Sequence, residues 1–296
     1  MNARALTLAL GGRWHGGYGS ACCPAHDDGN PSLSIRDGDD GALLTCHAGC
    51  ERADIIAELR RRGLWEASGK RPEGAELSTR VDNPSRRKLS LRNDNSEAAR
   101  RIWREAEPAP DTLVQSYLEA RGIRLNPPPS LRFAPALRYP FSGIELPAMV
   151  AAIQGPDRKL TGVHRTFLRV DGTGKANVQQ PKLSLGPQGK GAIRLARAGE
   201  VLGLAEGIED ALSAMQMFGI PCWCAISAGR LAKVALPDEV RHVHIFADHG
   251  EPGIKAAHEA VEAYTRQRRK VTLRLPPDGF ADWNEVLKAE AAGRAA

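Results

Sequence analysis

Short apolar runs alternate with helical stretches over the last hundred residues, and this alternation constrains the fold more than any other feature of the sequence. The runs of strand type are 201–205, 222–227, 242–247 and 270–275. The stretches of helical character between them are 207–218, 229–235 and 253–269. Strands that alternate with helices typically form a parallel sheet covered on both faces. We therefore predict an α/β fold in which a parallel sheet is flanked by helices.

The first fifty residues hold cysteines and histidines in two closely spaced pairs. One pair lies across a tight turn, and the other follows an expected hairpin of strands 33–36 and 42–45. Two such pairs supply the four ligands of a tetrahedral zinc site. The predicted ligands of a structural Zn²⁺ ion are Cys23, His26, Cys46 and Cys50. Cys22 and His47 are the substitutes in a register shifted by one residue, and free thiols are the alternative.

Changes in pattern divide the chain into four parts. Residues 14–66 form a small zinc-ribbon-like module, closed by an amphipathic helix. Residues 67–95 lack apolar periodicity and are rich in glycine, proline and charge, which indicates a basic linker. Residues 96–198 combine helical stretches with strand-like pieces, so we expect an α+β middle region there. The alternating pattern occupies residues 199–290.

Acidic residues follow two of the predicted strands at the point where each strand ends. Glu206 comes directly after run 201–205, and Asp248 directly after run 242–247. The carboxyl ends of parallel strands line one crevice, where converging carboxylates make a Mg²⁺ site. The alternative is that each acid caps the helix it precedes. Asp282 is ambiguous in the same way, because Asp282 and Glu285 have the spacing of a capping box.

Positive charge is concentrated in one segment. The chain carries a net charge of +6, whereas residues 60–104 contain thirteen lysines and arginines against six acids, an excess of seven. Such a segment suits a polyanion, although a solvated linker is the alternative. No apolar run approaches the ~18 residues that span a bilayer. The apolar stretch 5–10 has only six residues, which is too short for the apolar core of a secretory signal. We expect a cytoplasmic protein without a membrane partner.

These motifs resemble a known family. Glu206-Gly207 after a strand, Asp248 after a later strand and the segment Asp282-Trp283-Asn284-Glu285 look like the toprim domain of primases and topoisomerases. The Cys-Pro-x-His and Cys-His-Ala-Gly-Cys motifs resemble the zinc-binding domain of phage and mobile-element DNA primases. Segments 117–123 and 164–166 look like that family's middle region. The resemblance covers nearly the whole chain in the expected order.

The resemblance implies a DNA primase that joins ribonucleoside triphosphates into short RNA primers on a single-stranded DNA template. By analogy, Glu206 is a metal-associated acid or base, Asp248 is a ligand of catalytic Mg²⁺ or Mn²⁺, and Asp282 belongs to the same site. The zinc module engages the template. The residues expected to hold phosphates are Arg165, Lys175 and Lys182.

One position departs from the family pattern. Toprim domains carry Asp-x-Asp on the third strand, whereas this chain has Gly250 at the second acidic position and Glu251 one residue later. Glu251 is therefore a candidate Mg²⁺ ligand. The departure keeps two alternatives open: a zinc-dependent single-stranded DNA-binding accessory without catalysis, and a metal-dependent nuclease. Segment 186–191 lacks the spacing of a phosphate-binding loop, so we expect any replicative helicase to be a separate polypeptide.

Overall fold

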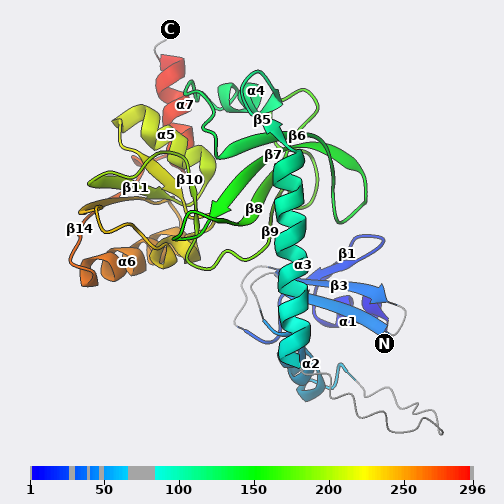
Figure 1. Cartoon of the computed structure of the whole chain (residues 1–296). Helices are drawn as coiled ribbons and strands as arrows, with labels where there is room; N and C mark the ends of the chain where they lie inside the picture. Colours follow the sequence, from blue (N-terminus) through cyan, green and yellow to red (C-terminus); the bar gives the residue numbers. More distant parts are fainter. Residues whose placement is uncertain (1, 27–30, 39–40, 47–49, 66–83, 294–296) are drawn as a thin grey trace, which may run out of the picture. The chain divides into compact units, whose positions relative to one another are not determined.

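The computed structural model describes residues 2–26, 31–38, 41–46, 50–65 and 84–293, and of residues 84–94 it describes the backbone. The chain divides into two units, Met1–Arg80 and Val81–Ala296. The expected zinc module lies in the first unit, and the middle and alternating regions both lie in the second (Figure 1).

The N-terminal unit is an antiparallel sheet with two helices. Its elements are α1 (Ala3–Ala9), β1 (Arg13–Trp14), β2 (Gly19–Ala21), β3 (Leu33–Gly38), β4 (Gly41–Cys46) and α2 (Arg52–Arg61), and the strand order is β1-β2-β3-β4. Leu6 of α1 is buried with Ile35 of β3 and Leu59 of α2 in one apolar core. Since α1 contributes to this core, the unit begins before residue 14, where the sequence placed its start. The expected hairpin is present as β3 and β4.

The second unit is built on one ten-stranded sheet. The elements of its first half are α3 (Pro84–Glu105), β5 (Glu107–Pro108), α4 (Leu113–Glu119), β6 (Leu131–Arg138), β7 (Glu145–Gln154), β8 (Leu160–Phe167), β9 (Lys182–Leu185) and β10 (Ala192–Arg194). Those of its second half are β11 (Val201–Ala205), α5 (Ile208–Phe218), β12 (Cys222–Cys224), the 3₁₀-helix η1 (Ala228–Lys233), β13 (His242–Phe246), α6 (Glu251–Arg266), β14 (Lys270–Arg274) and α7 (Trp283–Gly293). The main path of the sheet is β14-β13-β11-β12-β10-β7-β6-β5, and β8 joins β7 to β9.

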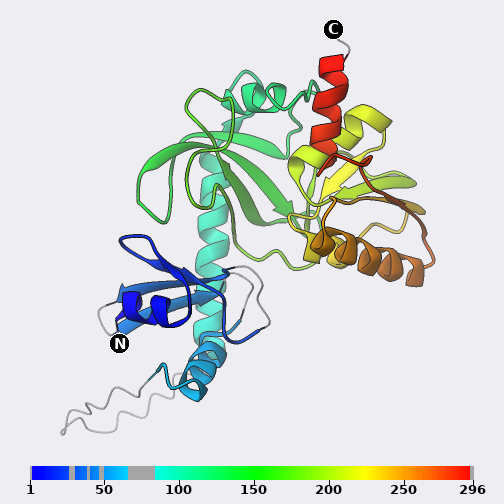
Figure 2. The same cartoon turned by 180° about the vertical axis from the view of Figure 1, so that it is seen from behind.

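The predicted parallel sheet is confirmed. Strands β14, β13, β11 and β12 are neighbours and run parallel to one another. Two apolar layers cover it: α5 and α7 pack on one face with Phe246, and α6 and η1 pack on the other with Trp223. Figures 1 and 2 show α6 on the side of the parallel strands opposite α5 and α7. Stretch 229–235 forms a 3₁₀-helix rather than an α-helix.

The middle region and the parallel strands share this sheet. Strand β10 pairs antiparallel with β7 on one side and with β12 on the other, so three residues join the antiparallel half to the parallel half. The two regions therefore have a common core on the face of α5, which includes Leu131 of β6 and Leu212 of α5.

Part of the expected linker is helical. Helix α3 begins at Pro84, whereas the sequence placed 67–95 in a linker. Pro84 suits the first turn of a helix, because its missing N–H has no partner there in any case. The polar residues that follow Pro84 gave no apolar periodicity from which to predict the helix. Residues 67–83 lie outside the described part of the chain.

Among the described helices, none is both long enough and apolar enough to cross a membrane.

Candidate metal and catalytic sites

The first candidate site lies where the ends of the N-terminal hairpin meet the start of α2. Cys46 is the last residue of β4, Cys50 precedes α2, and Cys23 and His26 follow β2. One ligand atom from each of these four residues lies within 4.8 Å of the other three. His26 Nδ1 is 3.1 Å from Cys50 Sγ and 4.0 Å from Cys46 Sγ. The four residues that the spacing singled out are thus together, with Cys23 rather than Cys22 in the group.

This donor set fits a zinc ion. Zinc–ligand bonds of about 2.0–2.3 Å in a tetrahedron separate the ligand atoms by about 3.3–3.8 Å. The two distances of 3.1 and 4.0 Å lie just below and just above this range, so small shifts would bring the donors to it. Burial, together with Cys46 and Cys50, raises the pKa of the Cys23 thiol to about 12. Because a bound divalent cation stabilises the thiolates, it would remove this obstacle to deprotonation. His47, the substitute ligand, lies outside the described residues.

The second candidate site lies at the carboxyl edge of the parallel strands. Glu206 and Asp248 follow β11 and β13, which pair in register up to Ala205 and Phe246. Neither acid caps the helix after it, because the N-cap residues of α5 and α6 are Gly207 and Gly250 and no side chain caps either helix. The capping alternative therefore does not explain these two carboxylates.

Asp248 is surrounded by negative charge that Lys182 offsets only in part. Burial, followed by Glu206 and Asp282, raises the pKa of Asp248 to about 7. The Oδ1 atom of Asp248 is buried and has no hydrogen-bond partner among the residues that the structure describes. A buried carboxylate oxygen without a donor, surrounded by further carboxylates, is a favourable position for a divalent cation.

Asp282 serves two purposes. Its Oδ1 accepts a 2.8 Å hydrogen bond from the amide of Glu285, and Glu285 Oε2 accepts one of 2.8 Å from the amide of Ala281. These bonds form the capping box that the spacing predicted at the start of α7, except that Glu285 bonds the amide of Ala281 rather than that of Asp282. The Asp282 carboxylate also raises the pKa of Asp248, so the cap lies beside the carboxyl edge. A 2.8 Å backbone hydrogen bond from His249 to Ala281 ties the two loops together.

Two further acids on the first turn of α5 belong to this site, and the sequence did not single them out. Burial raises the pKa of Asp210 well above its usual range, and Asp248, Asp282 and Glu209 add to the rise. Asp210 Oδ1 accepts a 3.2 Å hydrogen bond from the amide of Asn284, which fixes α5 to the start of α7. Acids at this position commonly complement the helix dipole. The signal that could have found them is their place on the apolar face of an amphipathic helix.

Glu209 is the acid of this site whose negative charge is balanced by a nearby positive charge. It accepts a hydrogen bond from the hydroxyl of Tyr117 on α4, and it forms a 3.1 Å ion pair with Lys175. Burial alone would raise the pKa of Glu209, but Lys175, Lys182 and Tyr117 outweigh it and lower the pKa to about 2. Lys175 and Lys182, both predicted to hold phosphates, thus lie close to the carboxyl edge.

Arg165 and Glu251 differ in their surroundings from the other candidates. Arg165 is buried, and its guanidinium donates to the backbone oxygens of Leu183 and Ser184 on β9, at 3.3 and 3.4 Å. These bonds give it a role in holding β9 against β8. Glu251 is exposed at the first residue of α6. Gly250, which precedes it, has φ +133°, a backbone conformation that an aspartate would rarely adopt.

Cys222 and Cys224 are buried thiols in β12. Cys224 Sγ donates to the backbone oxygen of Glu206 at 3.0 Å. This contact fixes the backbone of Glu206 at the carboxyl edge of the parallel strands.

Two family models match adjoining segments of the second unit. Residues 93–195 match a domain of unknown function, DUF7146. Residues 201–293 match the toprim domain, so this segment, with its carboxylates, is a toprim domain. No curated protein matches the chain.

Several solved primase structures are similar to the chain at low sequence identity. The zinc-binding and RNA polymerase domains of the Aquifex aeolicus primase share 16% identity with a TM-score of 0.44, over 98% of this chain and 81% of that one. The primase fragment of the bacteriophage T7 primase-helicase protein shares 14% identity with a TM-score of 0.38, over 93% and 97% of the two chains. A DNA primase domain from Pseudomonas aeruginosa shares 15% identity with a TM-score of 0.44, over 68% and 77%.

Proposed function

We propose that this protein is a DNA primase that joins ribonucleoside triphosphates on a single-stranded DNA template. The observation that carries the proposal is the buried, unpartnered Oδ1 of Asp248 beside Glu206 and Asp282, at the carboxyl edge of a toprim domain. A site with this excess of negative charge needs a divalent cation, and nucleotide joining is a reaction in which such a cation meets triphosphate oxygens.

Different residues of the site bind the cation, accept the proton and bind the phosphates. Asp248 and Asp282 would hold Mg²⁺ or Mn²⁺, with Asp210 in electrostatic interaction with both. When bound there, the cation would supply positive charge to offset the negative charge that develops on the triphosphate. Glu206 accepts at its carboxylate the proton of the 3′-hydroxyl group that attacks the α-phosphorus of the incoming triphosphate. Pyrophosphate leaves as the bond between the α- and β-phosphates breaks. Lys175 and Lys182 bind phosphate oxygens, and Glu209 and Tyr117 position Lys175.

The N-terminal unit contributes the template contact. The four-donor cluster of Cys23, His26, Cys46 and Cys50 holds Zn²⁺ and fixes the ends of the hairpin to α2, which presents Arg60, Arg61 and Arg62. A replicative helicase delivers the single strand.

The test is primer synthesis by the purified protein on single-stranded DNA with labelled ribonucleotides and Mg²⁺ or Mn²⁺. We expect short RNA products from the native chain and a loss of ~10²-fold or more in Glu206→Gln, which keeps the shape of the side chain and removes its charge. Glu262→Gln, an exposed change on α6, is the matched control and should keep full activity. Absence of RNA from the native chain, or full activity in Glu206→Gln, would contradict the proposal.

Gly250 favours a second candidate, a single-stranded DNA-binding accessory without catalysis. The loop after β13 supplies Asp248 but no second inward acid at residue 250, and Glu251 is exposed. This candidate predicts template binding without RNA synthesis. Loss of synthesis in Glu251→Gln would instead show that the second acid has moved by one position. Shortened template in the same assay would indicate the nuclease alternative.

A further inference from the structure

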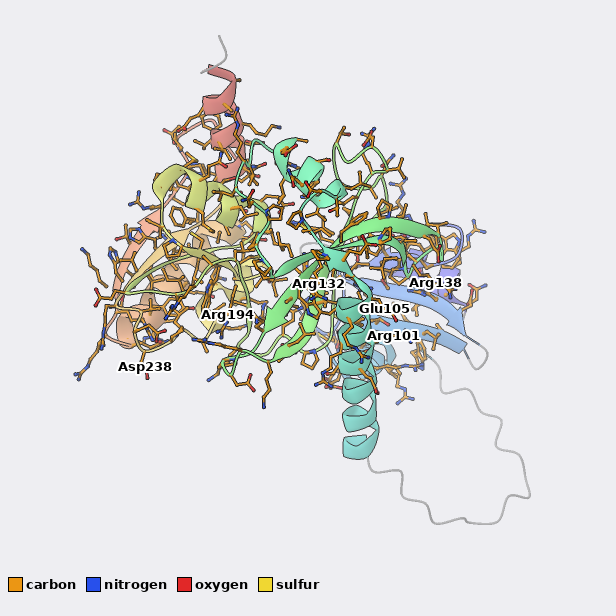
Figure 3. All side chains as sticks on the ribbon, turned by 45° about the horizontal axis from the view of Figure 1, so that its top comes forward. Arg101, Glu105, Arg132, Arg138, Arg194 and Asp238 are labelled. Carbon is orange, nitrogen blue, oxygen red and sulfur yellow. The ribbon has the colours of Figure 1, made fainter. Side chains whose placement is uncertain are left out.

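A basic groove lies on the face of the sheet opposite α5. On this face the strand register places Trp223 of β12 beside Arg194 of β10, and Arg132 of β6 beside Val150 of β7. Helix α3 packs over Val150, and α6 and η1 pack in the layer that holds Trp223. Figure 3 labels both arginines. Arg132 lies against Trp103 of α3, whereas Arg194 lies on the sheet between the layer of α3 and the layer of α6 and η1.

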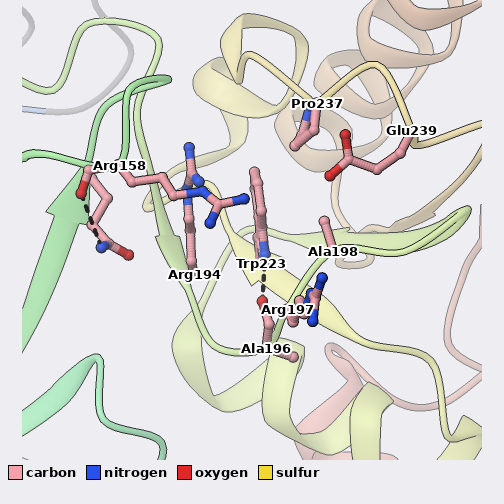
Figure 4. Close-up of a pocket in the computed structure, with 9 residues that line it drawn as sticks. Arg158, Arg194, Ala196, Arg197, Ala198, Trp223, Pro237 and Glu239 are labelled. Carbon is pink, nitrogen blue, oxygen red and sulfur yellow. Dashed lines mark hydrogen bonds between the residues drawn. The ribbon is translucent and has the colours of Figure 1, made fainter.

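Two connected hollows form the groove. The larger, of about 480 Å³, is lined by Arg158, Arg194, Arg197, Trp223 and Glu239 (Figure 4). The smaller, of about 340 Å³, is lined by Trp103 and Ser130, and it shares Gln154, Arg194, Ala196 and Arg197 with the larger. Glu239 lies just before β13, at the amino ends of the parallel strands. The groove is therefore at the opposite edge of the sheet from the metal site.

Arg194 is held rigidly at the junction of the hollows. Its guanidinium stacks over the Trp223 ring at 4.4 Å, and its Nη2 donates to the backbone oxygens of Gly155 and Pro156 at 2.7 and 3.3 Å. Its Nε atom is buried without a partner among the described residues. Burial and the neighbouring charge of Arg158 lower the pKa of Arg194. The positive charge of Arg158 beside Arg194 favours an anion in the groove, because an anion would relieve the repulsion between the two guanidinium groups.

Arg158 occupies a conformation that its residue type disfavours. It lies in the turn between β7 and β8 with φ +66°, in the left-handed region where glycine or asparagine is usual. A bulkier residue there costs roughly 1 kcal/mol, and such strain is often found at binding sites. Figure 4 shows the Arg158 side chain extending towards Arg194 and Trp223. The strained position thus places a second guanidinium in the groove.

We propose that this groove binds the phosphodiester backbone of a single-stranded nucleic acid, with Arg158 and Arg197 contacting phosphates. Among the described lining residues of the two hollows, Glu239 is the one acid against three arginines, which favours a polyanion. The arginines are spread along two hollows rather than gathered at one point, so an extended ligand suits them better than a single phosphate ion. The Trp103 ring in the smaller hollow and the Arg194 guanidinium stacked on Trp223 offer flat surfaces for unpaired bases.

The choice of a single strand rests on the proposed function, and it gives the template a second contact remote from the metal site. Strand binding here requires neither the divalent cation nor catalysis. Failure of this groove to bind and failure of primer synthesis can therefore be measured separately.

The test is fluorescence anisotropy with a labelled oligothymidylate and the full-length protein, in buffer without Mg²⁺, over a series of salt concentrations. The variant is Arg158→Gly with Arg197→Ala, since glycine suits the backbone at 158 and both side chains are exposed. We expect affinity to fall about tenfold, and the slope of log K against log salt to decrease by about 1.4 for two lost phosphate contacts. Arg197→Glu should weaken binding at least as much.

The matched control is Arg268→Gly. Arg268 is also exposed and has φ +60°, but it lies at the end of α6 outside the groove, so this variant should bind like the native chain. Unchanged affinity in the double variant and in Arg197→Glu would overturn the proposal. An equal loss for duplex DNA would overturn the assignment to a single strand. If polyglutamate bound with the same affinity and lost it in the same variants, the groove would be a site for acidic protein segments. Glu206→Gln should bind the oligonucleotide normally even if it makes no RNA.

Discussion

Replacement of Asp248 by asparagine should stabilise the protein in the absence of divalent cations. In the native chain this carboxylate is largely buried, has an unpartnered oxygen and lies beside Glu206 and Asp282, so its negative charge opposes folding. Asparagine has the same shape and no charge. The variant therefore removes the electrostatic penalty without leaving a cavity.

The size of the effect follows from the pKa of Asp248. The carboxyl titrates near 3.8 when unfolded and near 7 when folded. Below pH 4 both states are protonated, and between pH 4 and 7 the unfolded state alone loses its proton, so stability falls as the pH rises. The difference between these two pKa values corresponds to about 4 kcal/mol of folding stability lost above pH 7. Because the group is partly exposed, solvent screening reduces this loss to about 2 kcal/mol. For a unit of this size, that is a rise in Tm of about 4–8 °C.

Thermal unfolding at pH 8 and pH 4, with and without Mg²⁺, measures this effect. Asp248→Asn should unfold at a higher temperature than the native chain at pH 8 without metal, and at the same temperature at pH 4. Added Mg²⁺ should raise the Tm of the native chain more than that of the variant. Asp238→Asn is the control, because Asp238 is exposed (labelled in Figure 3) and precedes β13, whereas Asp248 follows that strand. A variant no more stable than the native chain at pH 8, or a gain that persists at pH 4, would refute the reasoning.

Three other changes test separate parts of the structure. Elemental analysis should find one zinc per native chain, and Cys50→Ser should lose the zinc and unfold the N-terminal unit, as seen by limited proteolysis. Glu209→Gln leaves Lys175 with no carboxylate partner, so chemical denaturation at pH 7 should show a loss of about 3 kcal/mol. That loss should shrink as the pH falls from 4.5 towards 2, where native Glu209 also gains its proton. Gly219→Ala at the left-handed C-cap of α5 should cost about 1 kcal/mol in the same assay.

The alternation of strands and helices predicted the parallel sheet because each of its strands is a short apolar run. Strand β11 coincides with run 201–205, and β13 and β14 each end one residue before the predicted boundary. The connection through β10 could not be predicted in the same way. A strand of three residues gives too little pattern, and its pairing with both β7 and β12 depends on contacts between distant segments. The first half of α3 was missed because its residues are mostly polar.

The candidate sites were predictable to different extents. The close spacing of the cysteines and histidines identified the four-donor cluster, since ligands near in sequence need little tertiary information to meet. Glu206, Asp248 and Asp282 could be grouped because strand order brings their loops to one edge. The role of Glu209 could not be inferred from the sequence, because its partners Tyr117 and Lys175 come from the middle region. Arg194 gave no signal, since its stacking on Trp223 depends on the pairing of β10 with β12.

The short strand β10 also determines whether the second unit can be cut into soluble fragments. Strand β12, with its buried Trp223, lies inside the sheet because β10 covers its outer edge. A fragment beginning after residue 198 would leave β12 as an apolar edge strand with unpaired amides and carbonyls, which is a template for self-association. We therefore expect the segment that matches the toprim domain, 201–293, to aggregate when it is produced alone. Strand β10, which precedes this segment, prevents such aggregation by pairing with β12.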